Sequence, residues 1–287
     1  MEVRILAEYS IKDIAVRIKN IEGTRQIIKA MELISSSKLQ KYKVQLEKTR
    51  LFSDSLNKSI KNIYSDRNLK NFICKENNTS QNSCYILIGS DKGMAGGYNI
   101  NILKLFEESK NSKEDIVLPI GKKMKDYFFK KNFILLSDKF YSCEKLSFEE
   151  CKKISDVILN KYYENNFSKV FLIYTKFISP LKQVSSIVKL FPIDSQNFCK
   201  NNKSNKLNFL CEPNYEECIK GIIPYYMSGT IWSAVCESLA SEYGARHTAM
   251  ESANKNACEM VDGLRLAYNQ LRQSSITQEI TEIVAGT

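Results

Sequence analysis

The stretch WSAVCESLASEYGARHTAMESANKNACEMVDGLRLAYNQL, residues 232–271, carries the pattern that decides the fold. Its apolar side chains are spaced alternately by four and three residues, which is the spacing of a coiled-coil seam. Random placement of apolar residues rarely sustains such a series over about five heptads. The stretch therefore predicts a long helix that pairs with a second helix through Trp232, Cys236, Leu239, Tyr243, Arg246, Met250, Ala253, Ala257, Met260, Leu264, Ala267 and Leu271, among which only Arg246 is charged.

This helix is expected to extend beyond its seam. Pro224 suits a first helical turn and no proline follows it, so a helix over 224–284 is predicted, roughly 90 Å long at 1.5 Å per residue. The positions that would continue the seam are Ser274, Gln278 and Thr281, which cannot drive pairing. The next apolar side chains fall on a shifted face: Ile276, Ile280 and Ile283. We therefore expect the last turns to meet a partner other than the second helix.

A second long helix is predicted over residues 11–64. Ser10 with Asp13 is typical of a helix N-cap. Gly23 is a weak point within the helix, because glycine costs about 1 kcal/mol relative to alanine. Apolar residues follow at spacings of three and four: Ile11, Ile14, Ile18, Ile21 and Ile28 with Arg25 on the same row, then Leu39, Tyr42, Leu46, Leu56, Ile60 and Ile63.

The charges of the two ends are complementary. Residues 1–65 hold 13 Lys and Arg against 7 Asp and Glu, whereas residues 222–287 hold 4 against 7. Two helices that pair with each other would show this difference, so an antiparallel coiled coil is predicted. The formal charge of +10 leaves open a basic face for an acidic partner. A nucleic-acid binder would carry that face on the projecting helix, which is net acidic, so we expect no nucleic-acid partner.

Between the two helices, short β-rich runs alternate with helical segments. This alternation is typical of an α/β domain with a largely parallel sheet. The predicted organisation is an N-terminal helix at 1–65, a central Rossmann-like α/β domain at 83–195, a linker at 196–221 and a C-terminal helix at 222–287. The β-rich runs are YILIGS (85–90), IVLPIG (116–121), FILLS (133–137), KVFLIYT (169–175) and VSSIVKLFP (184–192), and the helical segments are 99–110, 121–131 and 147–166.

The glycine-rich segment GSDKGMAGGYN (89–99) follows the first predicted strand, where dinucleotide sites lie in such folds. It matches neither the G-x-G-x-x-G pattern nor the Walker pattern. Gly93, Gly96 and Gly97 are therefore expected to serve a tight turn from strand to helix. A nucleotide-binding α/β protein with a coiled-coil arm is kept as the alternative.

Residue types for catalysis or metal binding are sparse. The single histidine, His247, lies within the predicted C-terminal helix and is expected on its surface or in an interface. The nine cysteines include no CxxC pair, which fits reduced thiols, although Cys199 and Cys211 could form a redox clasp. We expect no catalytic residue, cofactor or metal in this chain. No run of about 18 apolar residues predicts a membrane span, and no signal or organelle-targeting segment is recognised.

Three segments resemble the gamma subunit of F-type ATP synthases. IKDIAVRIKNIEGTRQIIKAMELISSSKLQK (11–41) is similar to its N-terminal helix, and SDKGMAGGYN (90–99) to its first strand-to-helix loop. ESLASEYGARHTAMESANKNACEMVDGLRLAYNQLRQSSITQEITEIVAGT (237–287) is similar to its C-terminal helix. Within the first segment, SSSK (35–38) stands where small alanines are more usual, and residues 60–82 and 195–210 match weakly.

The resemblance implies a central-stalk rotor that catalyses nothing itself. In the family, the paired helices enter the ring of alpha and beta subunits, and the foot sits with the epsilon subunit on the membrane ring of c subunits. Flow of protons or sodium ions turns the shaft, which drives the beta-subunit catalytic sites through different conformations. One copy per complex is implied, as a peripheral protein on the cytoplasmic face of the bacterial cell membrane.

The resemblance also implies two sets of contact residues. One set lies at positions that face the catalytic ring: Met31, Lys38, Arg246, Gln273, Thr277 and Glu279. The other belongs to the foot near the c ring, within the segment 209–213: Phe209, Leu210 and Glu212.

Overall fold

The computed structural model describes residues 10–64, 82–110, 112, 114–192 and 215–286. The chain divides into two compact units. One is the central unit, Ser37–Ala245, and the other is the terminal unit, formed by Met1–Ser36 together with Arg246–Thr287. The mixed α/β class with long terminal helices agrees with the prediction from sequence.

Two helices account for most residues outside the sheet domain. Helix α2 spans Ile11–Tyr64, 54 residues, as predicted. Its start is fixed by Ser10 and Asp13, whose side chains bond each other at 2.8 Å and cap the first turn, because the Asp13 N–H also donates to Ser10 Oγ. Helix α8 spans Tyr215–Ala285, 71 residues.

The predicted start of the C-terminal helix was wrong. Pro224 lies inside α8 and not in its first turn. A proline there removes one backbone hydrogen bond and crowds the carbonyl four residues earlier, at a cost of about 3 kcal/mol. Burial of the neighbouring Ile223, Tyr226 and Met227 offsets this cost. Tertiary packing therefore overrides the local signal that proline gives.

The central unit holds a five-stranded sheet with the order β3-β2-β1-β4-β5. Neighbouring strands are parallel except for β5, which runs antiparallel to β4. The strands are β1 (Ser83–Ile88), β2 (Ile116–Ile120), β3 (Ile134–Leu135), β4 (Lys169–Phe177) and β5 (Gln183–Phe191). The crossover helices are α4 (Tyr98–Ser109), α5 (Lys122–Lys130) and α6 (Phe148–Tyr163).

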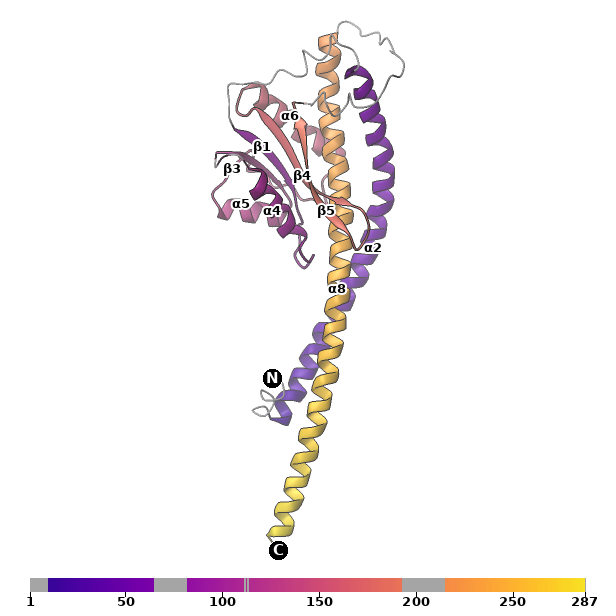
Figure 1. The fold of residues 1–287 in the computed structure, drawn as a ribbon, viewed down its shortest axis with the longest axis vertical. Helices are drawn as coiled ribbons and strands as arrows, with labels where there is room; N and C mark the ends of the chain where they lie inside the picture. The colour runs from indigo at the N-terminus through magenta and orange to yellow at the C-terminus, as the bar shows by residue number, and fades with distance from the viewer. Residues whose placement is uncertain (1–9, 65–81, 111, 113, 193–214, 287) are drawn as a thin grey trace. The chain divides into compact units, whose positions relative to one another are not determined.

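Strand β1 is buried on both faces, as expected of a central parallel strand. Because side chains alternate along a strand, Cys84, Ile86 and Ile88 enter one core and Tyr85 and Leu87 the other. Helices α4 and α5 cover the second core, and they lie together on one side of the sheet in Figure 1. The first core is closed by α6 and by the parts of α2 and α8 that belong to the central unit.

The terminal unit is an antiparallel helix pair, as predicted. Arg265 pairs with Glu22 at 2.7 Å, and Arg25 Nε donates to Asn254 Oδ1 at 3.3 Å, so residue numbers rise along one helix as they fall along the other. The buried apolar side chains of this unit are Ile14, Met250, Ala257, Val261 and Ala267.

One seam position was predicted wrongly. Met260 is 60% exposed, whereas its neighbour Val261 is 2% exposed. The step from Ala257 to the next buried residue is therefore four residues and not three. An undistorted helix has 3.6 residues per turn and drifts relative to a strict heptad count, which moves the buried face to the next residue.

Candidate functional site

The glycine-rich loop between β1 and α4 is closed by its own side chains. The Ser90 N–H donates to Asn99 Oδ1 at 3.1 Å, and Asn99 Nδ2 donates back to Ser90 Oγ at 2.7 Å. Gly96 and Met94 take left-handed backbone conformations with φ of 56° and 59°. The loop is thus the tight strand-to-helix turn predicted from its glycines.

Asp91, in the same loop, joins three parts of the central unit. Its Oδ1 accepts from the Lys122 N–H at 3.1 Å, at the start of α5. Its Oδ2 accepts from Ser142 Oγ at 2.6 Å and from the Glu144 N–H at 3.2 Å, in the segment that leads to α6. Asp91 therefore sets the position of the Glu144 backbone.

Helix α8 contacts the edge of the sheet at which doubly wound folds bind ligands. The strand order reverses at β1, so the crevice beyond the carboxyl ends of β1 and β4 is the topological switch point. Near the end of β4, the Thr175 N–H donates to Ser238 Oγ at 3.4 Å and the Thr175 carbonyl accepts from Ser241 Oγ at 3.1 Å. Both serines are fully buried residues of α8. Helix α8 is thus bonded to the end of β4 beside the switch point.

A cluster of four side chains, which we call the Lys38 cluster, lies beside this contact: Lys38 and Tyr42 of α2, Glu144, and Tyr243 of α8. Lys38 Nζ donates to Glu144 Oε2 at 2.9 Å and to Tyr243 Oη at 2.8 Å. The Tyr243 hydroxyl donates to the other Glu144 oxygen. The Tyr42 and Tyr243 rings stack with centroids 5.4 Å apart and planes 14° apart.

The cluster is built around a charged carboxylate. Burial by itself would raise the pKa of Glu144, but the hydrogen bonds from Tyr243 and Lys38 and the Lys38 charge outweigh it, so the pKa is lowered. Burial, followed by the charge of Glu144, raises the pKa of Tyr42 to about 12. The cluster therefore pairs Lys38 with a Glu144 carboxylate that is held charged, beside a Tyr42 phenol that is held neutral.

A second polar contact joins the same two helices to β4. Arg50 of α2 donates through Nη2 to the Phe177 carbonyl at 3.0 Å and lies 3.5 Å from Glu237 of α8. The Arg50 side chain is 46% exposed, and burial raises the pKa of Glu237 despite the arginine charge. This pair is consequently weaker than the one in the Lys38 cluster.

The residues expected to face the catalytic ring differ in exposure. Gln273, Thr277 and Glu279 are exposed on α8, whereas Met31 is half-buried. Lys38 bonds within the chain, and Arg246 is 3% exposed. The expected foot residues Phe209, Leu210 and Glu212 lie outside the described residues, as do Cys199 and Cys211.

Beyond Leu271 the buried face of α8 ends, as the seam predicted. The exposed fraction is 44% for Ile276 and rises to 70% for Ile283, with Ile280 between them. Val284 is exposed as well. We call Ile276, Ile280, Ile283 and Val284 the isoleucine face. It is an apolar surface carried by a helix, and contiguous exposed apolar surfaces are typical of sites that bind a protein, a membrane or a ligand.

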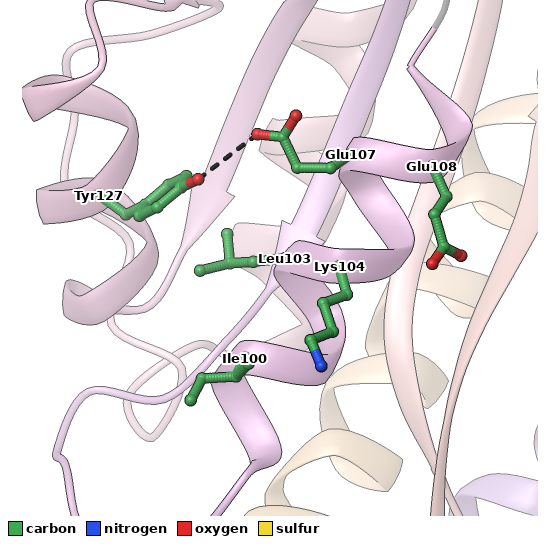
Figure 2. Close-up of a pocket in the computed structure, with 6 residues that line it drawn as sticks. All are labelled: Ile100, Leu103, Lys104, Glu107, Glu108 and Tyr127. Atoms are coloured by element: carbon green, nitrogen blue, oxygen red, sulfur yellow. Dashed lines mark hydrogen bonds between the residues drawn. The ribbon is translucent and has the colours of Figure 1, made fainter.

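A shallow groove of about 400 Å³ lies between α4 and α5. Figure 2 shows Tyr127 of α5 reaching toward Glu107 of α4, whose carboxylate accepts from the phenol at 3.4 Å. Glu107 also pairs with Lys110. The other lining residues are Ile100, Leu103, Lys104 and Glu108. The Lys104, Glu107 and Glu108 side chains point in different directions in Figure 2, so they do not converge on a common point.

Among the described residues, no group of three or more His, Cys, Asp or Glu side chains could hold a metal ion. His247 is half-buried in α8, in agreement with its expected place on a helix surface or in an interface. Cys84, Cys143, Cys151, Cys236 and Cys258 are free thiols, and burial raises the pKa of Cys84 and Cys151 to about 12. None of the described helices is long and apolar enough to span a bilayer.

Relatives of known identity match nearly the whole chain. A family model described as ATP synthase matches residues 10–287. The sodium-ion-specific ATP synthase gamma chain of Acetobacterium woodii is 35% identical over 294 residues, which cover 96% of this chain and 97% of the relative. The ATP synthase gamma chain of Alkaliphilus metalliredigens is 36% identical, with 96% of each chain covered.

Solved structures share the fold. The rotor of the Euglena gracilis mitochondrial ATP synthase matches with a TM-score of 0.62 at 18% identity, over 93% of this chain and 98% of that one. The central stalk and c ring of the Tetrahymena thermophila mitochondrial ATP synthase matches with a TM-score of 0.58 at 22% identity, over 79% of this chain and 99% of that one. The fold, with its long terminal helices and central sheet domain, agrees with the relatives above 30% identity. The chain belongs to the ATP synthase gamma chain family.

Proposed function

We propose that this chain is the central-stalk rotor of an F-type ATP synthase and transmits torque between a membrane c ring and the catalytic ring. The observation that carries the proposal is the isoleucine face, where α8 continues as a helix after its pairing seam has ended. Within a paired shaft, an apolar face of this kind fits a surrounding sleeve of other subunits.

A rotor acts by biasing its partners and performs no chemistry of its own. Each beta-subunit site changes conformation only as far as the shaft's contacts differ between its conformations. Alpha, beta and epsilon subunits and the c ring are the proposed partners, with one copy of this chain per complex. It is proposed to be a non-catalytic, peripheral component on the cytoplasmic face of a bacterial membrane, and the coupling ion, proton or sodium, is selected in other subunits.

The segments of the chain take different parts in this proposal. The helices at 1–65 and 222–287 form the shaft, 83–195 the globular domain, and 196–221 the linker and foot, with Phe209, Leu210 and Glu212 near the c ring. Met31, Lys38, Arg246, Gln273, Thr277 and Glu279 are proposed to contact the catalytic ring. Exposure of Gln273, Thr277 and Glu279 supports this for the last turns of α8.

Reconstitution tests the proposal directly. The chain is co-expressed with the alpha and beta subunits of the same organism, and the purified complex is assayed for composition and ATP hydrolysis. We expect one copy of the chain to join three alpha and three beta subunits and to produce a stable ATPase. If folded alpha and beta subunits fail to retain the chain, the rotor function is rejected.

Saturable nucleotide binding tests the alternative. An isolated chain that binds ATP or NAD, and loses binding in Gly96→Val, would support a nucleotide-binding protein. We expect no such binding, because Ser238 and Ser241 of α8 bond the end of β4 beside the switch point.

A further inference from the structure

We propose that the Lys38 cluster is the joint that fixes both shaft helices to the globular domain and carries torque between them. The inference rests on the proposed rotor function and deepens it. Lys38 belongs to α2, Tyr243 to α8, and Glu144 to the segment before α6. Each of the three side chains bonds the other two.

To transmit torque, this contact must resist rotation of the helices relative to the globular domain, and apolar packing alone is poorly suited to this. Hydrophobic attraction depends on buried area and not on direction, so it does not by itself fix the angle at which a helix lies on a sheet. Hydrogen bonds weaken steeply when their angle changes, and charge-assisted ones are the strongest. A polar joint between the helices and the domain therefore adds a directional resistance to rotation beyond that of the packed side chains.

The joint is anchored on the side of the domain. Glu144 cannot follow a moving helix freely, because its backbone N–H is bonded to Asp91 at 3.2 Å. Asp91 in turn is tied to the start of α5 through the Lys122 N–H. Strain on Lys38 or Tyr243 thus passes through Glu144 into the loop after β1 and the helix that follows β2.

The other polar contacts are less suited to this role. Ser238 and Ser241 bond only α8 to β4, so they leave α2 to its apolar packing. The Arg50 contact includes both helices, but its Arg50–Glu237 distance is 3.5 Å and the arginine is about half exposed. We expect the Arg50 contact to carry a smaller part of the torque.

Tyr243→Phe is the variant that isolates the joint. It removes only the hydroxyl that bonds Lys38 and Glu144, and it keeps the ring that stacks on Tyr42. Tyr225→Phe is the matched control, because Tyr225 lies exposed on the same helix with Lys152 4.9 Å from its ring centroid. Ile158→Val, a buried change in α6, controls for lost stability away from the cluster.

The experiment uses the complete ATP synthase in inverted membrane vesicles. ATP hydrolysis and ATP-driven ion pumping are measured on the same preparation, and their ratio reports coupling. For Tyr243→Phe we expect hydrolysis near the wild-type rate and a pumping-to-hydrolysis ratio lower by about twofold or more, from the loss of two hydrogen bonds. Glu144→Gln should lower the ratio further, and both controls should leave it unchanged.

Each outcome bears on one proposal. An unchanged ratio in both Tyr243→Phe and Glu144→Gln overturns the joint, as does a fall of equal size in Ile158→Val. If one cluster variant does not assemble, a bead is fixed to the globular domain of the other variant, and the spread of its angular positions is measured. A spread equal to that of wild type rejects the joint. Failure of the wild-type chain to assemble rejects the rotor function itself.

Discussion

At the scale of single residues, Gly121 is held in a backbone conformation that other residues rarely adopt. Its φ is +97°, and a Cβ there would lie 2.3 Å from the Gly89 carbonyl oxygen. Gly121→Ala is therefore expected to lower the free energy of unfolding by more than about 2 kcal/mol, through backbone strain and collision. Urea unfolding of the isolated chain measures this difference.

Gly93 provides the matched control in the glycine-rich loop. A Cβ at Gly93 would meet only Lys123 Cε, at an ordinary contact distance of 3.7 Å. Gly93→Ala should change the free energy of unfolding by less than about 0.5 kcal/mol. Equal effects at the two glycines would contradict the argument from conformation.

Glu237 predicts a dependence of stability on pH. Burial raises its pKa above the ordinary value of 4.5, although Arg50 and Lys176 oppose the shift. The folded chain then binds this proton more tightly than the unfolded chain, so the contribution of Glu237 to stability is present at low pH and is lost as pH rises through its folded pKa. Glu237→Gln should unfold at a higher temperature than wild type at pH 7, and the gap should shrink toward pH 4.5. A gap that widens on acidification would contradict the sign.

The sequence identified some site residues and missed their partners. Lys38 was named from family resemblance, but its bonds to Glu144 and Tyr243 join residues 106 and 205 positions away. Periodicity reports neighbours on one helix face and carries no information about such distant contacts. Tyr243 offered the one available signal, since a buried tyrosine on an apolar seam needs a partner for its hydroxyl.

At the scale of elements, the corrected seam of the terminal unit predicts a difference between adjacent residues. Val261→Ala should destabilise the helix pair by about 1.5 kcal/mol, at roughly 0.8 kcal/mol for each buried carbon removed. Met260→Ala should have an effect near zero, because that side chain is 60% exposed. Hydrogen exchange of the amides over 250–270 measures the helix pair separately from the sheet domain. Faster exchange in Met260→Ala alone would favour the original heptad count.

The elements that sequence predicted best have strong local signals. The bounds of α2 were predicted because the Ser10–Asp13 cap and a regular apolar row act on the same segment. The bounds of α8 were missed at Pro224, where burial of neighbours outweighs the cost of proline. The strand predicted from FILLS (133–137) is shorter in the structure, where β3 has two residues. This strand lies at the sheet edge and pairs on one side only.

At the scale of the whole molecule, the isoleucine face predicts that assembly and stability respond differently to one deletion. Removal of residues 276–287 takes away side chains that are exposed in the described part of this segment, so little buried area is lost. The thermal midpoint of the isolated chain should shift by less than about 2 °C, corresponding to about 1 kcal/mol. Assembly with alpha and beta subunits, or the coupling of the assembled complex, should be clearly weakened.

A substitution separates loss of the apolar face from loss of length. Replacing Ile276, Ile280 and Ile283 with serine keeps the segment and removes most of the face, so it should weaken assembly nearly as much as the deletion does. Glu282→Ala, also exposed on α8, is the control for a change at this surface that leaves the apolar side chains in place. If the deletion lowered the thermal midpoint of the isolated chain as strongly as it weakened assembly, the isoleucine face would be part of the chain's own core. Removing a surface that partner subunits bury should leave the stability of the isolated chain unchanged and should weaken assembly. These two results together would identify the isoleucine face as such a surface.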